Sequence, residues 1–131
     1  MVHRYENTHV TWYDLLNPTI EEVREIITEC NLPLNFASDM TTMTPRNEVL
    51  AAKGALKVTF DYPIVKRTDI THPHEIKFIA TKSALVTVRF EDIDAIHSYA
   101  KQFEVDSMLS NKRKLTGNIL FALLISYLYD S

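Results

Sequence analysis

The residues whose types and spacing come closest to a reactive or metal-binding site are two histidines and a glutamate. His72, His74 and Glu75 lie close together in the sequence, and imidazole with carboxylate is an established ligand set for zinc or nickel. On a strand, His72 and His74 share a face only if Pro73 does not bend the chain, and no third histidine follows at ligand spacing. The pattern therefore favours a structural or solvated role over a metal-dependent enzyme.

The remaining residues give little indication of a catalytic nucleophile or of a nucleotide-binding site. Cys30 is the single cysteine, which excludes an internal disulfide and fits a reducing compartment. It falls on the apolar stripe of an expected helix, where burial disfavours the thiolate. The two glycines, Gly54 and Gly117, are too few for a phosphate-binding loop or a dinucleotide fingerprint. We therefore expect a protein that is not an enzyme.

Composition indicates one ordinary globular domain over residues 1–131, because 46% of the residues are hydrophobic and 24% are charged. The net charge of -3 argues against a nucleic-acid partner, and the basic cluster at 112–114 is expected to be a solvated helix start. The N-terminus has no signal-peptide pattern. The longest apolar window, 115–129, falls short of the ~20 residues that a bilayer crossing needs, so the chain as given is expected to be soluble.

The element that organises the predicted fold is a β-hairpin over residues 75–90. Its two runs are rich in Ile, Val, Phe and Thr and are separated by a short polar break. Apolar residues occur on both faces of each run. We therefore expect the hairpin to lie in the middle of a sheet, with one face formed by Ile76, Phe78 and Ala80 on the first run and another by Val86, Val88 and Phe90 on the second.

Further strands are predicted on both sides of this hairpin. Residues 9–13 form an expected opening strand, with Val10 and Trp12 on one face. Residues 48–52 and 55–62 flank a turn-like Lys53-Gly54 pair and form a second hairpin. The polar segment 66–73 is expected to be a loop.

Amphipathic helices are predicted between and after the strands. The first begins at Pro18, or two residues later if Thr19 and Glu22 form a capping box. Its expected apolar stripe is Ile20, Val23, Ile26, Ile27 and Cys30. A short helix lined by Leu34, Phe36 and Met40 is predicted within 31–47.

Two more helices are predicted near the C-terminus. The first follows Phe90 and is broken at 106–111; its apolar stripe is Ile93, Ile96, Ala100 and Phe103. The last begins near Lys112 and is apolar on nearly all sides, which predicts burial on more than one face. Because no cap follows it before Ser131, we expect a boundary within a longer protein.

Four ordered motifs resemble the cytoplasmic domain of the CorA family of magnesium transporters. The first is the run Trp12-Tyr13-Asp14-Leu15-Leu16-Asn17-Pro18-Thr19, followed by Glu22-Val23. The second comprises Pro33-Leu34, the Asp39-Met40 region and Pro45-Arg46. The third is the hairpin from Glu75-Ile76 to Leu85-Val86-Thr87-Val88-Arg89, and the fourth runs from Leu120-Phe121-Ala122-Leu123-Leu124 to Asp130. Together the motifs span almost the whole chain.

The resemblance implies an α+β fold with three α/β/α layers, in which a mixed, largely antiparallel sheet has helices on both faces. It also implies a longer protein, in which a stalk helix and two membrane helices follow this domain and the subunits assemble as a homopentamer. The pore signature of the family, G-M-N, does not occur in this sequence. The implied location is the cytoplasmic face of the cell membrane, and the implied role is regulation and assembly.

The resemblance also implies a regulatory cation. Acidic side chains at domain interfaces of the family bind Mg²⁺ and hold the channel closed, and carboxylate oxygens suit this hard ion. Asp39 and Asp130 are the positions implied here, with Mg²⁺, Co²⁺ or another divalent cation as the ligand. A different hypothesis is a free-standing regulatory module of the same α+β fold that binds a small molecule.

Overall fold

A computed structural model describes the protein over residues 1–6, 9–42, 48–52, 54–62, 65–66, 69–70, 74–109 and 116–130. Within these ranges, side chains are described except at 60–62, 65–66, 69–70, 74, 106–109, 117–119 and 127–130.

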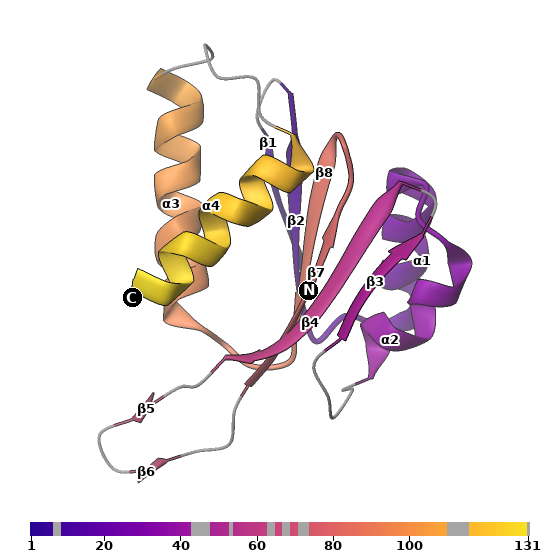
Figure 1. Ribbon diagram of the computed structural model, residues 1–131, viewed down its shortest axis with the longest axis horizontal. Helices are drawn as coiled ribbons and strands as arrows, with labels where there is room; N and C mark the ends of the chain where they lie inside the picture. The colour runs from indigo at the N-terminus through magenta and orange to yellow at the C-terminus, as the bar shows by residue number, and fades with distance from the viewer. Residues whose placement is uncertain are drawn as a thin grey trace.

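A six-stranded sheet in the order β1-β2-β8-β7-β4-β3 forms the middle of the molecule (Figure 1). Its strands in this order are Val2–Glu6, Thr11–Leu16, Ala84–Arg89, His74–Ala80, Ala55–Tyr62 and Glu48–Ala52. β2 and β8 pair in parallel, while the other neighbouring strands pair antiparallel. The sheet is therefore mixed and largely antiparallel, as expected.

Helices cover both faces of this sheet (Figure 1). On one face lie α1 (Ile20–Cys30), the short 3-10 helix η1 (Leu34–Phe36) and α2 (Ala37–Thr41). On the other lie α3 (Asp94–Leu109) and α4 (Gly117–Asp130). Each side has its own buried hydrophobic core, one including Phe36, Met40 and Ile79 and the other including Trp12 and Phe78. The predicted α+β fold with three layers is confirmed.

The central hairpin has the predicted position. β7 and β8 occupy the middle of the sheet, and alternate residues of each strand enter opposite cores. Ile76 and Phe78 pack under α3 and α4, whereas Ile79 pairs with Val86 under α1 and α2. The second hairpin, β3–β4, is also confirmed, and Gly54 supplies the left-handed φ of 77° beside its turn.

α1 begins where the capping box predicts. The Thr19 hydroxyl accepts from the Glu22 amide at 3.2 Å, and the Glu22 carboxylate accepts from the Thr19 amide at 2.9 Å. Ile20, expected in the apolar stripe, is instead 57% exposed. It is the first residue of the helix, and the residues buried against the sheet begin one turn later with Val23.

Other expectations at the element ends were wrong. The expected opening strand is the second strand, since β1 precedes it; β1 carries His3, Arg4 and Glu6 at a sheet edge, where one apolar face is not required. Leu34 is 76% exposed because η1 turns it away from the core. The segment predicted as a loop, 66–73, includes strand β6 (Asp69–Ile70) and overlaps the end of strand β5 (Val65–Lys66), and these two strands form a separate antiparallel pair.

The two C-terminal helices also differ from the prediction. α3 continues through Asp106 to Leu109. α4 begins at Gly117, and the expected start at Lys112 lies outside the described residues. Leu120 and Leu124 are buried, whereas Ala122 and Ser126 are exposed. Among its described side chains, α4 therefore buries one main face, despite its all-round apolar sequence.

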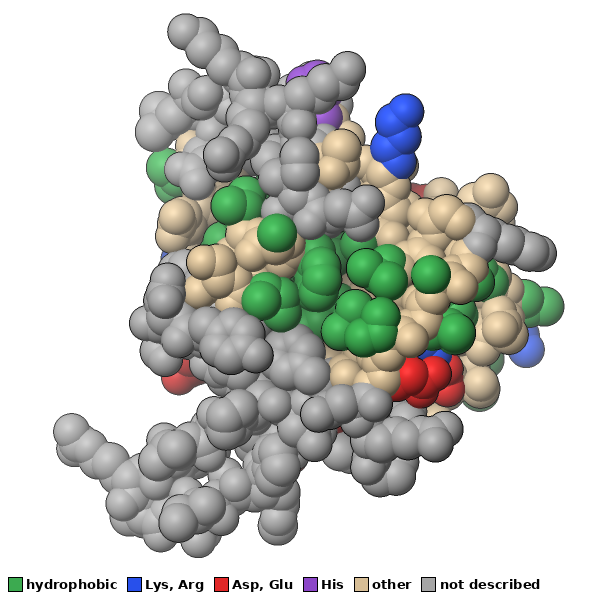
Figure 2. All heavy atoms as spheres, viewed as in Figure 1, with side chains coloured by type: hydrophobic (Ala, Val, Ile, Leu, Met, Phe, Trp, Pro, Cys, Tyr) green, Lys and Arg blue, Asp and Glu red, His purple; other side chains and the backbone are tan. Residues whose placement is uncertain are grey.

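Some apolar surface stays uncovered at the β3 edge. Val49 is 70% exposed and Leu50 is 37% exposed, and Figure 2 shows hydrophobic side chains gathered over β3 and β4. Within the part of the chain that is described, no helix is long and apolar enough to span a membrane.

Candidate functional site

Asp39, implied as a cation ligand, lies on α2 against a buried lysine. Phe36 and Met40 are fully buried and hold this short helix on the sheet. The ammonium of Lys57, on β4, donates to Asp39 Oδ2. The Lys57 side chain is only 2% exposed, while that of Asp39 is 36% exposed. The carboxylate thus lies between solvent and an internal ammonium group.

A second buried lysine reaches the same short helix. Lys77, on β7, is fully buried, and its ammonium donates to the backbone carbonyls of Asp39 and Thr42. It also pairs with Glu75 at 3.0 Å and lies 5.3 Å from the centre of the Phe90 ring. Carbonyls at the end of a helix lack partners within the helix, so Lys77 fastens the end of α2 to the sheet.

This arrangement does not form a ready-made Mg²⁺ site. Mg²⁺ binds through one or two carboxylates while keeping several waters, but an ammonium already contacts the Asp39 carboxylate. Among the described residues, no group of three or more His, Cys, Asp or Glu side chains is placed to hold a metal. A divalent cation at Asp39 would have to compete with Lys57.

Asp130, the second implied ligand, is the last residue of α4, and its side chain lies outside the description. Because α2 and α4 pack on opposite faces of the sheet (Figure 1), one chain does not bring Asp39 and Asp130 together. The two implied positions therefore belong to helices on opposite faces of the sheet.

The histidine-based site is not assembled by the described residues. His72 lies outside them, as does the side chain of His74. Glu75 is 4% exposed and its carboxylate pairs with Lys77. Glu75 therefore forms a buried ion pair with Lys77.

Cys30 behaves as the sequence predicts. Burial, followed by the nearby Glu29 charge, raises the pKa of its thiol to about 11. Burial likewise raises the pKa of the adjacent Tyr13 hydroxyl to about 12. Both groups are neutral at physiological pH, so a thiolate nucleophile is not favoured here.

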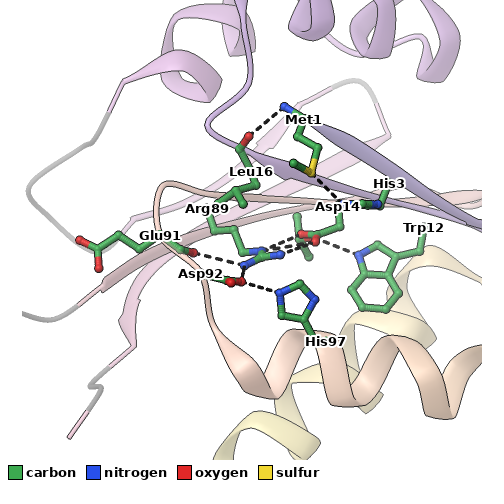
Figure 3. A network of polar contacts seen from close by, with 10 residues as sticks. Met1, His3, Trp12, Asp14, Leu16, Arg89, Glu91, Asp92 and His97 are labelled. Carbon is green, nitrogen blue, oxygen red and sulfur yellow. Dashed lines mark hydrogen bonds and ion pairs between the residues drawn. The ribbon is translucent and has the colours of Figure 1, made fainter. Parts of the chain in front are cut away.

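Sequence reasoning missed a buried polar network on the opposite face of the sheet (Figure 3). The Arg89 guanidinium donates from Nη2 to Asp14 Oδ2 at 2.9 Å and from Nε to Asp14 Oδ1 at 3.2 Å. The Thr87 hydroxyl donates to Asp14 Oδ1 at 2.8 Å and accepts from the indole of Trp12 at 3.0 Å. Arg89 is fully buried and Asp14 is 1% exposed. The network ties β2 to its parallel neighbour β8.

The same guanidinium also reaches the segment that leads into α3. Its Nη1 donates to the Glu91 carbonyl at 3.3 Å and to Asp92 Oδ1 at 3.0 Å, and His97 of α3 contacts Asp92 as well (Figure 3). Burial acts to lower the pKa of Arg89, but the hydrogen bonds and charges of Asp14 and Asp92 outweigh it and raise that pKa. Hydrogen bonds from His97 and Arg89 lower the pKa of Asp92. Arg89 therefore stays charged and fixes the entry to α3.

Comparison with protein families shows to which family the chain belongs. The profile described as CorA-like Mg²⁺ transporter protein matches residues 7–131. The chain belongs to this family. No curated protein matches it.

Solved structures share the fold of this CorA-like chain. The full-length CmaX protein matches 92% of the chain with a TM-score of 0.72 and 14% identity. The complete CorA magnesium transporter from Methanocaldococcus jannaschii matches 97% of it with a TM-score of 0.72 and 16% identity. The ZntB cytoplasmic domain from Vibrio parahaemolyticus matches 96% with a TM-score of 0.65 and 13% identity. The matches cover 36%, 39% and 49% of those chains, respectively, so this chain spans less than half the length of each.

Proposed function

We propose that residues 1–131 form one regulatory and assembly domain of a CorA-like transporter of Mg²⁺ or another divalent cation. The observation that carries this proposal is the family match over 7–131. Support comes from the fold, which also resembles the separately solved soluble domain of the M. jannaschii CorA with a TM-score of 0.68 over 94% of the chain. The proposed role is in transport and not in catalysis.

In this proposal the domain lies on the cytoplasmic face of the cell membrane, in a longer protein that crosses the membrane elsewhere. Similar structures contain more than twice the matched length, which leaves room for such segments. The proposed assembly is a homopentamer. The domain would then regulate the channel by binding intracellular Mg²⁺.

The proposed cation-binding positions are Asp39 and Asp130. Since α2 and α4 lie on opposite faces of the sheet, a single ion cannot bridge both residues of one chain. Each carboxylate would complete its ion shell with water or with groups of a neighbouring subunit. Such a site would make cation binding depend on assembly, as regulation through subunit contacts requires.

Calorimetric titration with Mg²⁺ tests the proposal, with light scattering used to measure the mass at each concentration. The proposal predicts millimolar binding that weakens in Asp39→Asn and Asp130→Asn. Glu25→Gln, an exposed charge change on α1, serves as the matched control and should bind as the parent does. Equal heats from all four proteins would reject these positions.

A cleft favours the alternative of a free-standing module that binds a small molecule. This cleft of about 380 Å³ lies beside the end of α1 and the start of β2, and its walls include Tyr13, Cys30 and Ser83. A small polar ligand that raises the melting temperature, with the rise lost in Tyr13→Phe and Ser83→Ala, would support this alternative. A domain regulated by Mg²⁺ alone would not need a small-molecule ligand in this cleft.

A further inference from the structure

We infer that Lys57 is a built-in competitor for a divalent cation at Asp39 and thereby sets the cation affinity of this position. The inference rests on the proposed function, because it concerns the regulation of the same carboxylate. It adds a residue that the resemblance to the family did not indicate.

The first support is the one-sided placement of the ion pair. Lys57 rises from β4 inside the domain, where its side chain is 2% exposed and its ammonium lies 5.1 Å from the centre of the Phe36 ring. Asp39 is 36% exposed, so a cation from solvent approaches a carboxylate that already has an ammonium group on its inner side. Lys57 lacks an easy route into water, because its stem is enclosed by the sheet and α2.

The second support is the local charge. Two buried ammonium groups, from Lys57 and Lys77, are matched by the two carboxylates of Asp39 and Glu75. Lys77 also contacts the Asp39 carbonyl, which places both positive charges around one residue. A divalent ion added to this balanced group meets repulsion at short range, in surroundings that screen charge less well than water does.

Removing the charge of Lys57 should therefore improve Mg²⁺ binding. Lys57→Gln leaves the Asp39 carboxylate accessible from solvent without its ammonium partner, and Lys57→Met replaces the four-carbon stem with an apolar chain of similar length that lacks the ammonium group. We expect the Kd for Mg²⁺ to fall by about tenfold or more in both variants, since tenfold corresponds to ~1.4 kcal/mol. Asp39→Asn added to Lys57→Gln should abolish the gain.

The control is Lys101→Gln, an exposed lysine on α3 at the opposite face, which changes the net charge equally. Calorimetry with MgCl₂ at constant ionic strength gives the Kd of each full chain, and circular dichroism establishes that each variant is folded. Tighter binding by both Lys57 variants but not by Lys101→Gln supports the inference. The inference is supported by this result even if the parent chain does not bind Mg²⁺. In that case Asp39 of the parent chain is not a cation-binding position, and that part of the proposed function is rejected.

Two results would overturn the inference. If the parent binds Mg²⁺ through Asp39 and the Lys57 variants bind equally, Lys57 is not a competitor, while the proposed cation site stands. If neither the parent nor a folded Lys57 variant binds, Asp39 is not a cation position, and both ideas fail there. Because Lys57→Met preserves the packing of the stem, at least one variant is expected to fold.

Discussion

Replacing Asp14 by Asn should destabilise the domain far more than replacing Asp92 by Asn, although both carboxylates bind the same guanidinium. Asp14 is 1% exposed and contacts Nε and Nη2 of Arg89. Asp92 contacts Nη1 at 3.0 Å, but its side chain is 66% exposed. Each substitution removes one negative charge that binds Arg89. The two carboxylates differ in burial, since Asp14 is enclosed by the protein and Asp92 faces solvent.

The magnitudes follow from burial. Removing one partner of a buried ion pair leaves an uncompensated charge and costs ~3–5 kcal/mol. Because Asn keeps one oxygen that can accept from Thr87 or Arg89, we expect a loss for Asp14→Asn near the lower limit, ~3 kcal/mol. The exposed pair with Asp92 is worth ~1 kcal/mol or less.

Equilibrium urea unfolding measures both losses. Trp12 is the single tryptophan, is fully buried and donates to Thr87 within the network, so its fluorescence reports on the same region. Far-UV circular dichroism should give a coincident transition if unfolding is two-state. A loss for Asp14→Asn no larger than that for Asp92→Asn would refute the view that the buried network holds β2 and β8 together.

Three further predictions concern local features of the fold. Thr19→Ala should lower the free energy of unfolding by ~0.5–2 kcal/mol, because it removes the N-cap of α1; urea unfolding measures it, and an unchanged midpoint would contradict the capping role. Met40→Ala should cost ~2–5 kcal/mol by opening a cavity under α2, whereas Val49→Ala on the exposed edge, measured in parallel, should cost little. Stability should fall as the pH rises from 9 towards 11, because the folded chain holds the Cys30 thiol neutral with a pKa raised from 9.0 to about 11, so the unfolded chain loses its proton first. Cys30→Ser should flatten that part of the pH profile, and a profile identical to that of the parent would count against the shifted thiol.

The parts of the fold that were predictable have local signals. The β3–β4 and β7–β8 hairpins combine apolar strands with short turns, and the start of α1 follows from the capping box of Thr19 and Glu22. In each case the pattern and the interaction that it predicts lie within a few residues. Apolar residues on both faces of the central strands predicted a hairpin in the middle of the sheet, whereas the three layers were implied by the resemblance to the CorA family.

The missed features depend on pairing between distant segments. β1 lacks an apolar face, and only its pairing with β2 defines it as a strand. Asp14 and Arg89 are 75 residues apart, and they meet because β2 and β8 pair in parallel with Asp14 opposite Thr87. A charged residue inside each of two apolar strands was the available signal, but the register that joins them was not visible in the sequence.

At the candidate cation site, too, one residue was predictable from the sequence and its partner was not. The resemblance to the CorA family supplied Asp39 as a position, whereas its partner depends on how α2 docks on β4. Lys57 alternates with Leu56 and Val58, a pattern typical of a solvent-facing lysine on a half-exposed strand. The structure instead buries it beneath α2, because the short helix covers that face of β4.

The most direct test of the proposed function is Mg²⁺ uptake into liposomes that contain the complete product of the encoding gene, measured at increasing internal Mg²⁺. If this chain is the regulatory domain of a CorA-like transporter, Mg²⁺ should enter and the rate should fall as internal Mg²⁺ rises, with a weaker fall in Asp39→Asn. No divalent-cation uptake, or a rate indifferent to internal Mg²⁺ in the parent protein, would contradict the proposal.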